Sequence, residues 1–263
     1  MTPTCPLVTC MTVSQPPRLR HLTAAIQDFR AQSWPRKELV IVLDDSEYSQ
    51  EVQTLIKGLD GDIRVLDFAE RAPLGKLRNA ALEYANGELI CQWDDDDRYS
   101  TQRLELQAEA ALDSGASACF LYQQLHYFES TRQLFWTDWR LCNGVKSVRP
   151  PSCWIPGTVL FRRGRLRYPE RGIFSSRGED SALTFALWRE NAVAIETPPG
   201  TYLRNFHGNN TWGWKHHSGL AHKRSQDLST LYAWRADLED AARRFGLGNS
   251  ISLMAGKEIA FRI

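Results

Sequence analysis

Short apolar runs that alternate with amphipathic segments constrain the fold of roughly the first 120 residues. Four runs have the nearly continuous apolar character of strands covered on both faces, and they are residues 7–12, 38–43, 63–66 and 88–93. Between and after them, apolar residues recur at helical spacing, in 19–29, 52–59, 77–85 and 104–112. Strands that alternate with helices predict an α/β chain with a mostly parallel central sheet.

The regular alternation ends near Ala118. Beyond this residue we expect antiparallel strands and a helix, with strands at 120–128, 133–139, 158–162 and 192–196 and a helix at 179–191. The last 35 residues are expected to be mostly helix. Gly87 follows the 77–85 segment where a glycine often closes a helix, so it is expected to be the C′ residue. No repeat or linker divides the chain, which favours one domain with a helical C-terminal extension.

Composition excludes several classes of protein. Hydrophobic residues make up 43% and charged residues 24%, so the chain is neither disordered nor collagen-like. The formal net charge of +1 gives no general field for binding nucleic acid. The start of the chain lacks the basic and apolar regions of a signal peptide, and no stretch reaches the ~18 apolar residues that span a bilayer. Six cysteines without CxxC or zinc spacing are expected to be reduced thiols in a cytoplasmic protein.

The chain also lacks the signatures of several common enzyme classes. It has no GxGxxG after a strand, no P-loop, no GxSxG and no HExxH. These absences disfavour a dinucleotide oxidoreductase, a P-loop NTPase, an α/β-hydrolase and a zincin.

Four consecutive aspartates, Asp94 to Asp97, directly follow the expected strand ELICQW. Ligands of open α/β sheets bind beyond the carboxyl ends of the strands. Two carboxylates ~4 Å apart repel by about 1 kcal/mol in water and by about 4 kcal/mol at an effective dielectric of 20. At a partly enclosed sheet edge, this repulsion favours a bound Mg²⁺ or Mn²⁺ or raised pKa values. A solvated acidic turn is the alternative.

Other polar residues gather at expected strand ends and helix starts. Asp44, Asp45 and Ser46 follow the second strand, where they either form a turn or accept hydrogen bonds from a base or a ribose. Lys76 and Arg78 lie at the start of a helix, a position that holds phosphate or is merely solvated.

Two later segments also carry candidate residues. Gly178, Glu179 and Asp180 precede a helix, as a cap or as a presented loop. His207 lies in a Gly- and Asn-rich loop after a strand, which suits a ligand as well as an ordinary polar histidine. Tryptophans such as Trp212 either stack on sugars or pack in the core.

Taken together, these segments resemble glycosyltransferase family 2, nucleotide-sugar transferases with the GT-A fold. LGKLRNAALEYANGELICQWDDDDRY resembles the approach to the acidic metal motif of that family. The segments PLVTCMTV, ELVIVLDDS, RGEDSALTFAL and FHGNNTW follow in the order of the family. The resemblance covers residues 5–212 and implies a GT-A domain over 1–212. We expect this domain to consist of a nucleotide-sugar half (about 5–120) and an acceptor half (about 121–212). A helical extension of the same domain is expected to follow over 213–263.

The resemblance implies a role for each candidate residue. Thr12, Asp44, Asp45, Lys76 and Arg78 would contact the donor, along with Asp94 and Asp95. Asp96 and His207 would bind the metal, and Asp94 the metal or the ribose. Asp180 would be the catalytic base, and Glu179 and Trp212 would contact the acceptor. The glycine that usually follows the aspartate pair is missing here, and four consecutive aspartates leave the register open, so Asp95 and Asp97 remain alternative ligands.

The implied function is a metal-dependent, inverting transfer of a sugar from a nucleotide-diphosphate sugar, with UDP favoured and Mn²⁺ or Mg²⁺ as cofactor. The expected acceptor is a saccharide of a cell-surface glycan. A peptide acceptor, a sugar-nucleotidyltransferase and a non-catalytic interaction module are the alternatives. The expected location is the cytoplasm, and contact with the inner face of the membrane stays open. Nucleic acid is not an expected partner.

Overall fold

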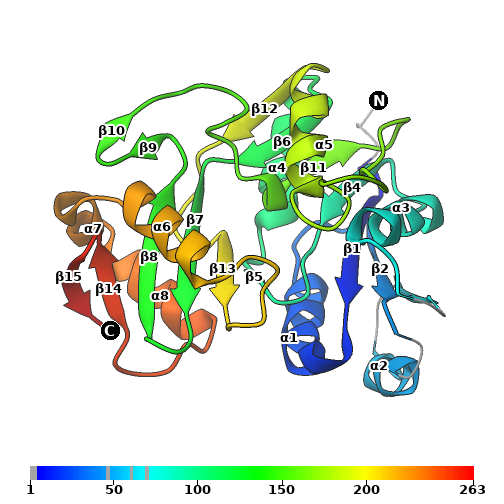
Figure 1. Cartoon of the computed structure of the whole chain (residues 1–263), viewed down its shortest axis with the longest axis horizontal. Coiled ribbons are helices and arrows are strands. Elements are labelled where there is room, and N and C mark those ends of the chain that lie inside the picture. The colour runs from blue at the N-terminus through cyan, green and yellow to red at the C-terminus, as the bar shows by residue number, and fades with distance from the viewer. Residues whose placement is uncertain (1–4, 46–47, 60–61, 69–70) are drawn as a thin grey trace. The chain divides into compact units, whose positions relative to one another are not determined.

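The computed structural model of the chain describes residues 5–45, 48–59, 62–68 and 71–263. The chain divides into two compact units (Figure 1). Unit 1 comprises Met1–Asp97, Thr101–Phe120 and Pro156–Val193. Unit 2 comprises Arg98–Ser100, Leu121–Ile155 and Ala194–Ile263. None of the described helices is both long and apolar enough to span a membrane.

A seven-stranded sheet with the order β12-β6-β11-β4-β1-β2-β3 organises unit 1. Its parallel strands are β1 (Val8–Ser14), β2 (Lys37–Leu43), β3 (Asp62–Asp67) and β4 (Leu89–Gln92). β11 (Leu160–Arg162) runs antiparallel between β4 and β6 (Ala118–Leu121). β12 (Ala192–Ile195) forms the edge. The predicted α/β class with a mixed, mostly parallel sheet is confirmed.

The helices of unit 1 lie where apolar periodicity predicts them. They are α1 (Leu19–Arg30), α2 (Ser49–Ile56), α3 (Leu74–Tyr84), α4 (Arg103–Asp113) and α5 (Glu179–Trp188). In α1, Leu22, Ile26 and Phe29 form one fully buried stripe, and Phe29 packs edge-on against Trp93 at the end of β4. α3 packs against β1 and β2, which places its first turns near the carboxyl edge of the sheet. The 3-10 turn η1 (Pro16–Arg18) leads from β1 into α1.

Gly87 has a different role from the one predicted. α3 ends at Tyr84 with an extended Ala85, and Gly87 does not adopt the left-handed conformation of a C′ glycine. A Cβ atom at Gly87 would instead lie 2.6 Å from the backbone nitrogen of Thr9 and 2.8 Å from the carbonyl oxygen of Leu7. The glycine is therefore required because two backbone segments approach closely, which local helix periodicity cannot reveal.

Unit 2 contains a six-stranded sheet with the order β15-β14-β8-β7-β13-β5. The strands are β5 (Arg98–Tyr99), β7 (Gln123–Phe128), β8 (Gln133–Asp138), β13 (Tyr202–Phe206), β14 (Ser252–Ala255) and β15 (Glu258–Arg262). β7 and β8 pair antiparallel as predicted, and a small two-stranded sheet joins β9 (Leu141–Cys142) to β10 (Val145–Lys146). A core cluster that includes Leu125, Trp136, Leu203 and Phe245 supports the six-stranded sheet.

The C-terminal region is helical only in part. It begins with α6 (Trp214–Arg224), α7 (Leu228–Ala233) and α8 (Arg235–Arg244), and the Asp227 carboxylate caps α7 by accepting the backbone N–H of Thr230 at 2.8 Å. The sequence patterns did not predict the hairpin of β14 and β15 at the C-terminal side of these helices. β14 pairs parallel with β8, more than 100 residues earlier in the chain, so its pairing partner is not a local feature of the sequence.

At Gly75, α3 lies in close contact with the segment before α5. A Cβ atom there would lie 1.9 Å from the carbonyl oxygen of Pro169, and the backbone N–H of Gly75 donates to the carbonyl of Ser175 at 2.8 Å. We expect Gly75→Ala to lower the free energy of unfolding by about 1–3 kcal/mol, measured by urea denaturation. Gly219→Ala is the matched control in α6, because its Cβ atom would meet nothing within 4 Å and its effect should be neutral or mildly stabilising. Equal effects of the two substitutions would contradict this packing.

Candidate active site

Parallel pairing gathers the predicted donor residues at one edge of the sheet of unit 1. The register aligns Ser14 of β1 with Leu43 of β2, and Met11 of β1 with Gln92 of β4. Because parallel strands end at the same edge, Asp44 and the four aspartates after β4 all follow strand ends on this side. Thr12 is buried there, and its hydroxyl donates to the carbonyl of Trp93 at 2.7 Å.

Asp95 and Asp96 share a cation that the sequence patterns did not single out. The Arg18 guanidinium lies 2.9 Å from Asp95 and 3.3 Å from Asp96, and the Ser14 hydroxyl donates to Asp95 at 2.6 Å. Burial raises the pKa of Asp95, and Asp96 adds to this, while Arg18 opposes it. Arg18 belongs to the turn that directly follows β1, so its place after a strand end was the signal that could have identified it.

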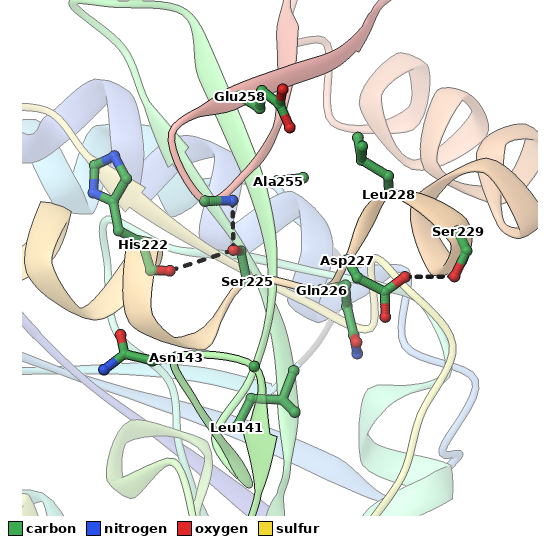
Figure 2. Close-up of a pocket in the computed structure, with 12 residues that line it drawn as sticks. Leu141, Asn143, His222, Ser225, Gln226, Asp227, Leu228, Ser229, Ala255 and Glu258 are labelled. Atoms are coloured by element: carbon green, nitrogen blue, oxygen red, sulfur yellow. Dashed lines mark hydrogen bonds between the residues drawn. The ribbon is translucent and has the colours of Figure 1, made fainter.

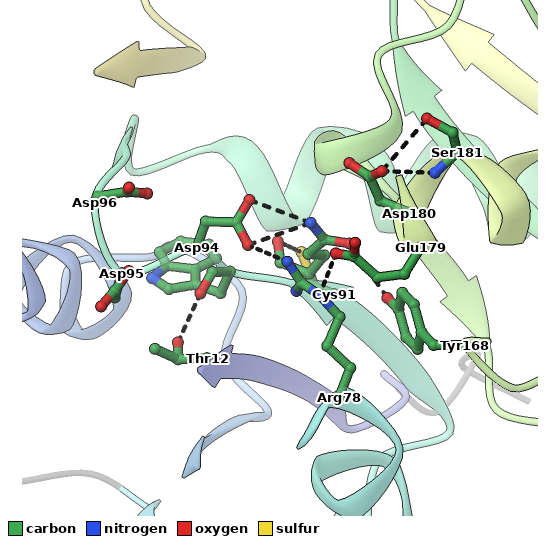
Figure 3. A network of polar contacts seen from close by, with 12 residues as sticks. Thr12, Arg78, Cys91, Asp94, Asp95, Asp96, Tyr168, Glu179, Asp180 and Ser181 are labelled. Atoms are coloured by element: carbon green, nitrogen blue, oxygen red, sulfur yellow. Dashed lines mark hydrogen bonds and ion pairs between the residues drawn. The ribbon is translucent and has the colours of Figure 1, made fainter. Parts of the chain in front are cut away.

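Asp94 is held by a second cation, Arg78 of α3, which is buried. The guanidinium of Arg78 donates to Asp94 at 2.9 Å and to Glu179 at 3.1 Å, and its carbon lies 5.6 Å from the centre of the Tyr168 ring. Gln92 donates to both carboxylate oxygens of Asp94 at 3.2 Å. Figure 3 shows Asp94 turned toward Arg78, while Asp95 and Asp96 point elsewhere. Arg78 thus connects α3, the loop after β4 and α5.

Arg78 remains a cation in this setting. Burial alone would lower the pKa of its guanidinium, but Asp94 and Glu179 outweigh burial and raise it. The pKa of Glu179 is also raised, because burial and the neighbouring Asp180 disfavour the carboxylate more than Arg78 favours it. Within the part of the chain that the structure describes, the Nη1 atom of Arg78 is buried and has no hydrogen-bond partner. A buried donor of this kind is suited to an anionic ligand.

Asp180 and Glu179 begin α5 but face different surroundings. The carboxylate of Asp180 accepts the backbone N–H of Ser181 at 2.6 Å, as Figure 3 shows, and its side chain is partly exposed. Glu179 is buried against Arg78. Glu179 therefore positions Arg78 in this structure, and its contact with an acceptor stays a prediction, as does the role of Asp180 as a base.

The remaining predicted donor residues differ in exposure. Asp44 is buried and accepts the amide of Gln15 at 3.1 Å and the backbone N–H of Ala72 at 3.2 Å. Asp45 is half-buried, and Lys76 is exposed in the first turn of α3. Ser46 lies outside the described residues. Their contacts with a donor remain predictions.

His207 and Trp212 belong to unit 2. His207 follows β13, and its backbone N–H donates to the side-chain oxygen of Asn210 at 3.0 Å. Trp212 is 38% exposed and stacks on His216, with ring centres 4.6 Å apart. The predicted roles of His207 as a metal ligand and of Trp212 as an acceptor contact are not tested by these local contacts.

A pocket of about 650 Å³ lies in unit 2, and Figure 2 shows its lining. The Ser225 hydroxyl accepts the backbone N–H of Gly256 at 2.7 Å, and Ser229 donates to Asp227 at 2.6 Å. None of the site residues predicted from the sequence lines it. The pocket therefore does not coincide with the predicted active site.

The carboxylates of unit 1 offer the oxygen ligands that a hard divalent cation prefers, but the described side chains do not form a complete coordination shell. Asp94, Asp95 and Asp96 offer oxygen atoms only, which suits Mg²⁺ or Mn²⁺. Among the described residues, no group of three or more His, Cys, Asp or Glu side chains converges to hold a metal. Asp94 and Asp96 retain 25% and 11% side-chain exposure, whereas Asp95 retains 1%. An ion here would need further ligands from a bound substrate, as is usual for Mg²⁺.

Comparison with known proteins decides the family. The model of glycosyl transferase family 2 matches residues 18–174, more than half of the chain. The chain belongs to glycosyl transferase family 2. This membership confirms the family that the sequence resembles and agrees with the predicted class of enzyme.

A curated relative agrees with the assignment to this family. A Bacillus subtilis (strain 168) protein named as a teichuronic acid biosynthesis glycosyltransferase, TuaG, is 29% identical over 116 residues, which are 44% of this chain and 46% of that protein. The chain thus spans about half the length of that curated relative.

Solved structures share the fold. Staphylococcus aureus TarS residues 1–349 in complex with UDP match with a TM-score of 0.58 and 14% identity, over 82% of this chain and 70% of that chain. The mannosyltransferase PcManGT from Pyrobaculum calidifontis, in complex with GDP-Man and Mn²⁺, matches with a TM-score of 0.54 and 12% identity, over 95% and 77%. At this identity the likeness establishes the fold alone.

The network around Arg78 predicts a large loss of stability on its removal. Arg78→Leu leaves Asp94 and Glu179 without their shared cation, so we expect the free energy of unfolding to fall by roughly 3–5 kcal/mol in urea denaturation. Arg78→Leu combined with Glu179→Leu removes one charge of each sign and should recover part of this loss. Losses that simply add in the double variant would show that the two side chains do not interact.

Proposed function

We propose that the chain transfers a sugar from a UDP-sugar to a saccharide acceptor with inversion at the anomeric carbon, aided by a divalent cation. The observation that carries this proposal is the cluster at the sheet edge of unit 1, where Asp94 lies beside the buried cation Arg78 and Asp96 beside the half-buried cation Arg18. Family membership supplies the class of donor. The base, the metal, the stereochemistry and the acceptor are parts of the proposal.

The donor diphosphate is proposed to bind at Asp94, Asp96 and Arg78. The buried and unpartnered Nη1 atom of Arg78, within the described part of the chain, supports an anion there. A cation held by Asp94 and Asp96 would neutralise the negative charge on the leaving diphosphate. TarS has been solved with UDP and with UDP-GlcNAc, which favours UDP, whereas PcManGT was solved with GDP-Man.

Asp180 is proposed to act as the general base. The acceptor oxygen forms a bond to the anomeric carbon while the bond from that carbon to the diphosphate oxygen breaks, and its electron pair leaves with UDP. The acceptor proton passes to a carboxylate oxygen of Asp180. The partial exposure of Asp180, in contrast to buried Glu179, supports this assignment because a base must reach the acceptor.

A saccharide is the favoured acceptor. The relative TuaG is named for teichuronic acid biosynthesis, which supports a glycan of the cell surface. The exposed ring of Trp212 is of the kind that stacks on sugars. A peptide acceptor is the alternative, because a side-chain nucleophile satisfies the same chemistry.

The role of Asp180 predicts a selective loss of turnover. Asp180→Asn should lower the rate of UDP release about 10²–10⁴-fold, because general-base help has that magnitude. Binding of the UDP-sugar, measured by calorimetry, should stay nearly unchanged. Asp113→Asn, an exposed aspartate at the end of α4, is the control and should keep full turnover. If donor binding falls as much as turnover, Asp180 has a structural role instead.

The role of Asp96 predicts a loss of metal-dependent nucleotide binding. Calorimetry with UDP should show tighter binding in the presence of Mn²⁺ than with a chelator, and Asp96→Ala should remove this difference. Asp62→Ala, an exposed aspartate at the start of β3, should preserve it. GDP titrated in parallel tests the preference for UDP. Binding of UDP that is independent of Mn²⁺ in the unmodified protein would refute the proposed metal dependence.

A further inference from the structure

The segment from Arg162 to Arg177, between β11 and α5, concentrates positive charge on the surface of unit 1. Its six arginines and one glutamate give it a net charge of +5, whereas the whole chain carries +1, so the rest of the chain carries −4. All six arginines are exposed. They are Arg162, Arg163, Arg165, Arg167, Arg171 and Arg177. In a chain that is nearly neutral overall, one strongly basic segment gives a positive potential at that part of the surface only.

A tight turn in this segment presents two large apolar side chains. The backbone N–H of Ser175 donates to the carbonyl of Gly172 at 3.2 Å, and its hydroxyl donates to the same carbonyl at 2.9 Å. Ile173 and Phe174 are the two central residues, with 84% and 49% exposure. Central positions of turns ordinarily carry Gly, Pro, Asn or Asp. An isoleucine and a phenylalanine there leave large apolar surfaces in contact with water.

The turn is fixed to α3 by hydrogen bonds on both sides of it. Before the turn, Asn79 exchanges two hydrogen bonds of 2.9 Å with the backbone of Tyr168 and donates to Glu170 at 2.7 Å. After it, the carbonyl of Ser175 accepts the N–H of Gly75 at 2.8 Å. Ile173 and Phe174 are thus held out from a supported loop. Little ordering of the backbone would be required when they contact a partner.

We propose that Arg162–Arg177 is a docking surface for an anionic lipid bilayer, with Ile173 and Phe174 inserting among the headgroups and the arginines contacting lipid phosphates. Apolar side chains flanked by arginines combine the two forces that bind proteins to anionic membranes. Arg165 and Arg171 have no hydrogen-bond or ion-pair partner among the described residues, so their charges are available to phosphates. Arginine side chains can also lay their methylene groups along lipid while the guanidinium stays at the interface.

The apolar pair favours a bilayer over nucleic acid. Nucleic acid would be held by the arginines and by aromatic stacking on bases, and an aliphatic side chain offers no flat face for stacking. Ile173 is the most exposed of the large hydrophobic residues that the structure describes, and a bilayer interface is where it gains from leaving water. This surface is inferred from the structure alone and does not depend on the proposed sugar transfer.

The test is cosedimentation of the full chain with vesicles of phosphatidylcholine alone or of phosphatidylcholine mixed with phosphatidylglycerol. We expect binding to the mixed vesicles only, and weaker binding at higher salt because the arginine contribution is screened. Arg165→Gln with Arg171→Gln should weaken binding roughly thirtyfold, since each arginine near an anionic surface contributes about 1 kcal/mol. Ile173→Ser with Phe174→Ser should weaken binding at least about tenfold.

Matched controls show whether binding depends on this segment or on any exposed arginine or apolar side chain. Arg189→Gln with Arg262→Gln removes two exposed arginines outside the segment and should leave vesicle binding unchanged. Phe185→Ser with Ile259→Ser removes side chains with 50% and 49% exposure and should also have little effect. Thermal unfolding of each variant shows that it is folded.

Three results would overturn the proposal. The first is no binding to the mixed vesicles, or equal binding to phosphatidylcholine alone. The second is binding that both control variants weaken as much as the segment variants do. The third is binding that depends on Arg165 and Arg171 but not on Ile173 and Phe174, and that a single-stranded oligonucleotide displaces, since this would identify a general polyanion site. Because no outcome measures catalysis, failure here leaves the proposed sugar transfer untouched.

Discussion

The buried Arg78 guanidinium is the interaction on which the candidate active site depends. A cation enclosed by protein is unfavourable unless carboxylates surround it, and here Asp94 and Glu179 come from the loop after β4 and from α5. Arg78 and Glu179 are both buried, so each would be unfavourable as an ion without an opposite charge beside it. The pairing therefore fixes α3, the end of β4 and the start of α5 relative to one another within unit 1. Asp180 follows Glu179 directly, so the same ion pair also positions the proposed base.

Arg18 reduces the repulsion among the adjacent aspartates that follow β4. It forms ion pairs with Asp95 and Asp96, while Arg78 forms one with Asp94, so two cations from different elements reduce the repulsion among these three aspartates. This arrangement makes the aspartates unequal. Asp95 is enclosed by Ser14 and Arg18, whereas Asp94 and Asp96 keep part of their surface exposed. Alternation of this kind supports the proposal that Asp94 and Asp96, the first and third positions of an Asp-x-Asp motif, are the ligands.

Sequence patterns predicted the features that depend on local periodicity. The apolar run of β2 and the buried stripe of α1 follow from spacing alone, and parallel strands then place their polar ends at one edge. The contacts inside the site could not be predicted in this way. Arg78 and Glu179 are 101 residues apart, and nothing local in either segment indicates their pairing. The same limit applies to Gly87, whose lack of a side chain is required by the nearby backbone of Thr9. It also applies to β14, whose pairing partner β8 is distant in the sequence.

α3 links the site to the basic surface of unit 1. Its first turns carry Gly75, which holds the turn at Ser175, and Arg78, which holds Asp94. Asn79, one residue further along, fixes Tyr168, whose hydroxyl donates to Gln92 of β4 at 3.2 Å. The proposed lipid-contacting turn and the aspartates are therefore supported by neighbouring residues of one helix. A protein that docks through this turn would hold its donor site at a fixed place relative to the bilayer within unit 1, which is the arrangement needed to act on an acceptor presented at a membrane surface.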